Sequence, residues 1–102
     1  MSQVIIKLVD NSLMTEFYFT KDQAAKANEL FKAGKYRFGG DFIFSQEGED
    51  ACEEAFDLTN NPNRQFERNK YYGRNRSVSV GDIVEVDGVN YVCASAGWEQ
   101  LA

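Results

Sequence analysis

Histidine is absent from this 102-residue chain, and its two cysteines, Cys52 and Cys93, belong to no Cys-x-x-Cys pair. Ordinary zinc sites need several such ligands, so the sequence predicts no metal site. The missing imidazole also removes the side chain whose pKa suits proton transfer near neutral pH, together with Ser-His and Cys-His nucleophile pairs. We therefore expect no catalytic residues and no cofactor, and we expect both thiols to be buried as small apolar side chains.

Long apolar runs are missing as well. No run approaches the roughly 20 residues that a helix needs to cross a bilayer, and residues 1–10 lack the pattern of a secretory signal. A cytoplasmic protein with no membrane partner is expected. The hydrophobic fraction of 43%, with eight Phe and five Tyr, is typical of a globular chain. Without repeats or linkers, residues 1–102 are expected to form a single domain.

The chain opens with two strand patterns and a helix pattern. Apolar residues alternate over 3–9 and over 14–19, and the polar residues 10–12 between them favour a turn. These segments predict an opening antiparallel hairpin. Thr20 is expected to cap the following helix, which the helical spacing of its apolar residues continues to Gly34.

The middle of the chain predicts a strand region and an acidic helix. Residues 35–45 alternate like a strand on both sides of Gly39-Gly40, where we expect a turn. In the segment 48–58, GEDACEEAFDL, the apolar residues share one helical face.

A further short helix is expected to follow. Asn61-Pro62 is typical of a cap residue followed by a first-position proline. We expect this helix to end at Gly73, with Phe66 as its apolar anchor and Tyr71 as a second candidate.

The last quarter of the chain has the period of strands. Val78 and Val80 alternate, and Asp87-Gly88 favours a type I′ hairpin turn that leads into the returning strand 89–94. Trp98 and Leu101 are expected to pack back on the sheet.

These elements predict an α+β fold. We expect a small antiparallel sheet with two to three short helices packed on one side and a C-terminal β-hairpin. An SH3-like barrel formed by the C-terminal strands is the alternative. Edge strands can pair between copies, so the protein is expected to be a monomer or a homodimer.

Charge is segregated along the chain, whose formal net charge is -5. Residues 41–57 contain seven acids and no base. They form either a solvated helix face or an anionic surface that docks on a basic partner protein. The residues expected to make contact on this acidic face are Glu47, Glu49, Asp50, Glu53 and Glu54.

Residues 64–76 have the opposite sign. Cations interleaved with aromatic rings suit single-stranded nucleic acid, because cations bind phosphates and rings stack on bases. The alternative is that these cations pair with the neighbouring acidic helix. The candidate nucleic-acid-binding residues are Arg64, Arg68, Lys70, Tyr71, Tyr72, Arg74 and Arg76.

The segment RSVSVGD, residues 76–82, lies between the basic stretch and the hairpin. In a strand, the hydroxyls of Ser77 and Ser79 would share one side, and Gly81-Asp82 would bend the chain. The main interpretation is that this segment has a structural role, as a strand that ends in a bend of the chain. The alternative is a ligand edge at which Arg76, Ser77 and Ser79 hold an anion or a polar group of a partner.

The block from Ala55 to Trp98, which contains FDLTNNPNR, YYGRNRSVSVGDIVEVDG and YVCASAGW, resembles small accessory proteins encoded by bacteriophages and plasmids. Its Arg-Ser-x-Ser-x-Gly-Asp core is similar to that of the YodL-like group. The resemblance covers a little under half of the chain and implies no catalytic residues.

The first functional hypothesis is a non-catalytic, phage-encoded accessory protein. It would bind and modulate a host protein in the host cytoplasm, for host takeover or anti-defence. The alternative is a nucleic-acid-binding module that uses the basic stretch. An enzyme based on a carboxylate or a tyrosine is the least expected class.

Overall fold

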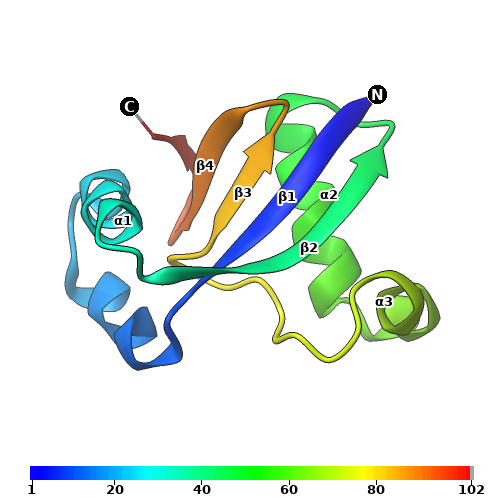
Figure 1. The fold of residues 1–102 in the computed structure, drawn as a ribbon, viewed down its shortest axis with the longest axis horizontal. Coiled ribbons are helices and arrows are strands. Elements are labelled where there is room, and N and C mark those ends of the chain that lie inside the picture. Colours follow the sequence, from blue (N-terminus) through cyan, green and yellow to red (C-terminus); the bar gives the residue numbers. More distant parts are fainter. Residues whose placement is uncertain (102) are drawn as a thin grey trace.

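The structure is a computed structural model that describes residues 1–101. One antiparallel sheet has the strand order β2-β1-β3-β4-β5, with helices against it (Figure 1). Its elements are β1 (Ser2–Val9), the 3-10 helix η1 (Asn11–Phe19), α1 (Gln23–Lys32), β2 (Tyr36–Phe44), α2 (Gly48–Asn60), the 3-10 helix η2 (Pro62–Arg64), α3 (Gln65–Tyr71), β3 (Ile83–Val86), β4 (Val89–Ala94) and β5 (Gly97–Gln100).

The predicted α+β class, with its antiparallel sheet and C-terminal hairpin, is confirmed. The sheet is open, with β2 and β5 as its edges, so the SH3-like barrel alternative is wrong. β1 is the first strand in the chain, yet it lies inside the sheet, between β2 and β3 (Figure 1). The N-terminal strand therefore depends on residues far along the chain for both of its partners.

The predicted opening hairpin is wrong, because residues 14–19 belong to the 3-10 helix η1. The carboxylate of Asp10 caps this helix by accepting from the Ser12 N–H at 2.9 Å. A 3-10 helix repeats every three residues, which places Met14 and Phe17 on the same side. Phe17 is fully buried, whereas Phe19 is almost fully exposed. The alternation in this segment therefore did not reflect a strand.

The predicted helix after it is confirmed as α1, and Gly34 ends it in the left-handed region with φ +73°. Its cap differs from the prediction. Asp22 caps the helix by accepting from the Ala25 N–H at 3.0 Å, while the Thr20 hydroxyl donates to the Glu16 carbonyl at 2.8 Å. Thr20 is thus engaged with the preceding η1 and not with α1.

Gly39 and Gly40 lie inside one continuous strand, β2, so the turn predicted there is wrong. The pairing with β1 shifts register at this point, which marks a β-bulge. A Cβ at Gly40 would lie 2.9 Å from ring atoms of both Phe42 and Tyr72. The glycine pair therefore permits close packing and a bulge in the strand, and does not reverse the chain.

The acidic helix is confirmed as α2, with Ala51, Cys52 and Ala55 buried. Asn61 accepts from the Asn63 N–H at 2.9 Å and precedes Pro62, as predicted, although the turn that follows is the short η2.

The predicted anchors of α3 are wrong. Phe66 is 82% exposed and Tyr71 is 58% exposed. The neighbouring Tyr72 is buried instead, and its hydroxyl donates to the Arg76 carbonyl at 2.7 Å. The chain leaves the helix at Gly73, where φ is +74°.

The C-terminal hairpin has the predicted turn. Asp87 and Gly88 have φ of +49° and +86°, as a type I′ turn requires at both central residues. Residues 76–79, however, are not part of a strand, so the expected alternation of Ser77 and Ser79 across a sheet does not occur.

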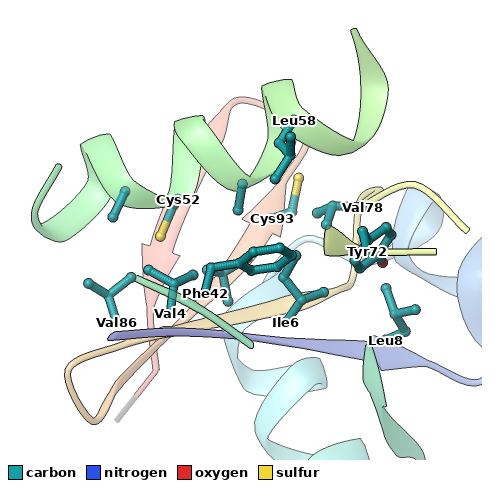
Figure 2. Packing of buried hydrophobic residues seen from close by; sticks show 13 residues of the cluster. Val4, Ile6, Leu8, Phe42, Cys52, Leu58, Tyr72, Val78, Val86 and Cys93 are labelled. Carbon is teal, nitrogen blue, oxygen red and sulfur yellow. The ribbon is translucent and has the colours of Figure 1, made fainter. Parts of the chain in front are cut away.

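Two hydrophobic clusters lie on opposite faces of the sheet, because neighbouring residues of a strand point to opposite sides. Leu8 and Cys93 belong to the first cluster, and their neighbours Val9 and Val92 belong to the second. In the first, α2 and Tyr72 pack over Val4, Ile6 and Cys93 (Figure 2). In the second, η1 and α1 cover one end of the other face. Trp98 packs against the first cluster, and Leu101 is buried in the second.

Candidate protein-binding surface

Arg76 and Asp82, the two charged ends of the RSVSVGD segment, form an ion pair inside the protein. Nη1 of Arg76 donates to Asp82 Oδ2 and to the Ser77 carbonyl, and Nη2 donates to Asp82 Oδ1 and to the Val9 carbonyl. Nε donates to Asn11 Oδ1 at 2.8 Å. These bonds account for all five N–H groups of a guanidinium, so none is left for an anion.

Asp82 is fully buried, and its carboxylate joins distant parts of the chain. Oδ1 accepts from the Val9 N–H at 2.9 Å, and Oδ2 accepts from the Ser79 N–H at 2.8 Å. Burial alone would lower the pKa of Arg76, but the hydrogen bonds and the charge of Asp82 outweigh it and raise that pKa. The pair ties the end of β1 to the start of β3.

The two serines of the segment have different surroundings. The Ser77 hydroxyl donates to the Thr59 carbonyl at 2.6 Å, at the C-terminal end of α2. The Ser79 hydroxyl has no hydrogen-bond partner within residues 1–101, while its N–H is bound to Asp82. The segment thus has internal contacts at Arg76, Ser77 and Ser79, and these support its structural interpretation.

The first two arginines of the basic stretch are also engaged internally. Arg64 binds the carboxylates of Glu54, Asp57 and Glu67 at 2.8 to 2.9 Å. Arg68 donates to the carbonyls of Thr59, Gly73 and Asn75. They therefore bind α3 to α2 and close the C-terminal end of α3.

The remaining members of the basic stretch divide between surface and core. Lys70 and Arg74 are exposed, and Lys70 Nζ lies 5.2 Å from the centroid of the exposed Tyr71 ring. Tyr72 is buried, and its pKa is raised to about 12 by burial. A nucleic-acid interface would consequently have to rest on Lys70, Tyr71 and Arg74, less than half of the set that the sequence predicted.

The predicted acidic face lies along α2. Glu49 and Asp50 are exposed and have no ion-pair partner within residues 1–101. Glu53 is exposed too and accepts from Trp98 Nε1. Glu47, just before the helix, lies 3.8 Å from the N-terminal ammonium group. Glu54 departs from the set, because Arg64 covers it.

Both cysteines are reduced and buried, as the sequence predicts. Cys52 projects from α2 and Cys93 from β4 into the first hydrophobic cluster (Figure 2). Burial raises the pKa of each thiol to about 12. The thiolate, which is the nucleophilic form, is therefore strongly disfavoured in the folded protein.

A groove of about 390 Å³ runs beside the open edge of β2. Its walls come from β2 and from the α2–α3 pair, three segments that are separate in the sequence, and so sequence reasoning did not find it. The apolar residues 42–44 at the end of β2 were the available signal. The lining residues are Asp41, Phe42, Ile43, Phe44, Glu54, Leu58, Arg64, Glu67 and Tyr71.

Residues 1–101 hold no group of three or more Cys, Asp or Glu side chains placed to bind a metal ion. Among the same residues, no helix has both the length and the apolar character to span a bilayer.

Compared with protein-family models, with curated proteins and with solved structures, the chain has no match in any of the three.

Proposed function

We propose that this protein is a non-catalytic interaction module that binds a partner protein through the outer face of α2. The distribution of charge on that helix carries the proposal. Glu49, Asp50 and Glu53 are exposed on its N-terminal half, whereas Arg64 neutralises the carboxylates at its C-terminal end. The uncompensated charge is thus gathered on one part of the helix and faces solvent.

A partner with a cationic surface fits this face. Clustered charge of one sign accelerates association with a surface of opposite sign and orients the two proteins, and salt weakens both effects. The resemblance of residues 55–98 to phage and plasmid accessory proteins suggests that the partner is a bacterial host protein whose activity the module modulates.

Two carboxylates, those of Asp10 and Glu67, have a lowered pKa. Hydrogen bonds from the backbone and the hydroxyl of Ser12 lower the pKa of Asp10, and hydrogen bonds from Arg64 lower the pKa of Glu67. A general acid near neutral pH needs the opposite shift. Neither of these two carboxylates is therefore suited to act as a general acid near neutral pH.

The test is capture of a partner from a bacterial lysate by the unmodified chain, followed by charge reversal. We expect one stoichiometric protein to be retained, and we expect Glu49→Lys with Asp50→Lys to release it. Both acids lie in the first turn of α2, where negative charge interacts favourably with the helix dipole. Each reversal should therefore lower the free energy of unfolding by roughly 0.3–1 kcal/mol. Thermal melting of the variant checks that it remains folded.

A matched control carries the same change in net charge elsewhere. Glu29 and Glu99 are exposed, and neither forms an ion pair within residues 1–101. Glu29→Lys with Glu99→Lys should retain the partner. If the control releases it as well, or if neither variant does, the assignment to α2 fails.

A further inference from the structure

The open edge of β2 has backbone groups that point away from the sheet. On β1, the N–H and C=O of Gln3 both bond to Asp87, on the β3 side. Because alternate residues of a strand point their polar groups to opposite sides, Val4 faces β2, where it pairs with Phe42. Phe42 therefore points toward β1, and its neighbours Asp41 and Ile43 point outward.

These outward groups are unpaired in the described chain. Nearer the bulge, the Gly39 carbonyl accepts from Asn75 Nδ2 at 2.6 Å, so the loop after α3 covers that part of the edge. Beyond it, the N–H and C=O groups of Asp41 and Ile43 have no hydrogen-bond partner within residues 1–101. An uncovered edge of this kind is a template for another strand.

The groove lies on the α2–α3 side of this edge and is built to receive side chains. A strand added to β2 would direct every second side chain into it, between Phe44 on one wall and Leu58 and Tyr71 on the other. Its remaining side chains would lie on the opposite face of the sheet, beside Asp41 and the 62%-exposed Ile43.

The charge around the edge selects between possible occupants. The described lining residues include three carboxylates, of Asp41, Glu54 and Glu67, against one cation, Arg64, so the groove keeps a net negative charge after Arg64 has paired with the two glutamates. A second copy of this chain would bring another acidic edge against the first, which is unfavourable. An extended segment that alternates apolar and cationic residues is complementary in both shape and charge.

We propose that the β2 edge binds an extended, cationic segment of a partner protein by β-strand addition. This deepens, and rests on, the proposed interaction function. Main-chain hydrogen bonds to Asp41 and Ile43 would supply affinity, apolar side chains in the groove would supply register, and a lysine or arginine of the segment would lie beside Asp41.

The probe is a blocked nine-residue peptide of alternating valine and lysine, with a valine–glutamate peptide as its control. NMR titration of the full chain in 0.15 M salt measures binding, and amide hydrogen exchange is measured on the same samples. The lysine peptide should bind and slow exchange at the amides of Asp41 and Ile43. The glutamate peptide should leave both unchanged.

Ile43→Pro separates strand addition from general charge attraction. Proline removes the outward N–H without removing a bond to β1, and edge strands tolerate it. Ile43→Ala is its matched control, because it shortens the side chain and keeps the N–H. Because the proline variant loses main-chain contacts at this residue, it should bind the lysine peptide roughly tenfold more weakly than the alanine variant does. Melting curves check that both variants are folded.

Three results would overturn the proposal. The peptide could bind the proline and alanine variants equally while the Glu49, Asp50 double reversal abolishes binding, which would leave the α2 proposal standing without the groove. The peptide could fail to bind at millimolar concentration. Sedimentation could show a dimer that Ile43→Pro dissociates, and the occupant would then be a second copy.

Discussion

Position 82 shows how one buried side chain can determine the conformation of a loop. Asp82 is enclosed by Arg76 and by the backbone amides of Val9 and Ser79. Removing one member of a buried ion pair leaves the other charge without compensation, whereas removing an unbound surface hydroxyl changes little. Neighbouring residues of the RSVSVGD segment should therefore differ widely in their contribution to stability.

Asp82→Ala is expected to lower the free energy of unfolding by about 3–5 kcal/mol, because Arg76 then remains part-buried with no carboxylate. Ser79→Ala, which keeps the N–H that Asp82 binds, should change it by no more than about 0.5 kcal/mol. Urea unfolding of both variants at pH 7 measures the two values. A loss below about 1 kcal/mol for Asp82→Ala would contradict a structural role for the pair.

Gly81→Ala should be destabilising for two separate reasons. The residue has φ +99°, and an added Cβ would lie 2.6 Å from Cδ2 of the buried Phe17. Gly97 has a similar φ of +94° but open space around the added atom. Gly97→Ala should then cost about 1–2 kcal/mol from backbone strain alone, and Gly81→Ala a further 1–3 kcal/mol or so from overpacking. If thermal melting shows the same loss of stability in both variants, the loop at Gly81 moves aside freely.

At the scale of elements, α3 depends on polar contacts more than on apolar ones. No residue of this seven-residue helix is buried. Arg64 at its start binds Glu54 and Asp57 of α2. Arg68 within it donates to the carbonyl of Thr59, at the end of α2, and to that of Gly73, just after α3. A short helix with this kind of attachment should open more readily than the sheet.

Arg64→Ala is expected to accelerate amide exchange throughout α3 and to lower the free energy of unfolding by about 1–2 kcal/mol, since a network of charge-assisted bonds is lost. Arg74→Ala removes an exposed cation that forms no ion pair within residues 1–101, and should leave exchange in α3 unchanged. Hydrogen exchange read by NMR compares the two. Similar exchange in both variants would mean that the arginine does not hold α3 in place.

At the scale of the whole molecule, one core contains both thiols, and this makes stability depend on pH. The pKa of Cys52 and of Cys93 is raised to about 12 by burial, whereas a cysteine in the unfolded chain has a pKa of about 8.5. Above that lower value the unfolded state releases protons that the folded state retains. The free energy of unfolding must then fall as pH rises.

The expected slope between pH 8.5 and 9.5 approaches about 1.4 kcal/mol per pH unit for each thiol, with full stability retained below pH 8 or so. Urea unfolding at pH 7.5, 8.5 and 9.5 measures it. The Cys52→Ala, Cys93→Ala double variant should be less stable at pH 7.5 but should lose less on going to pH 9.5. Parallel curves for the two proteins would show that the thiols are not responsible.

Two predictions that depended on local chemistry were confirmed. Asp87-Gly88 formed the type I′ turn because both positions need positive φ, and Ala51, Cys52 and Ala55 were buried because they share one side of α2. The predicted opening hairpin, which needed a partner strand, was wrong. The alternation over residues 14–19 has no strand beside it, since β2 and β3 occupy both sides of β1.

The candidate sites divide in the same way. The acidic helix face was predictable, because its carboxylates are close in sequence and α2 is amphipathic. The internal use of Arg76 was not, since Val9 and Asn11, which accept from it, lie more than sixty residues away. The same holds for the groove beside β2, whose walls meet only in the folded chain.

By itself the sequence determined the α+β class, the helix faces, the hairpin turn and the absence of imidazole chemistry, all of which follow from residue type and short-range spacing. Tertiary structure alone decided which charges are free. Arg76 and Asp82 are buried against distant backbone groups and bond to each other inside the protein. The acidic residues of α2 and the polar groups of the β2 edge face solvent, where a partner can reach them. The physical reason is that hydrogen bonding and desolvation depend on neighbours in space.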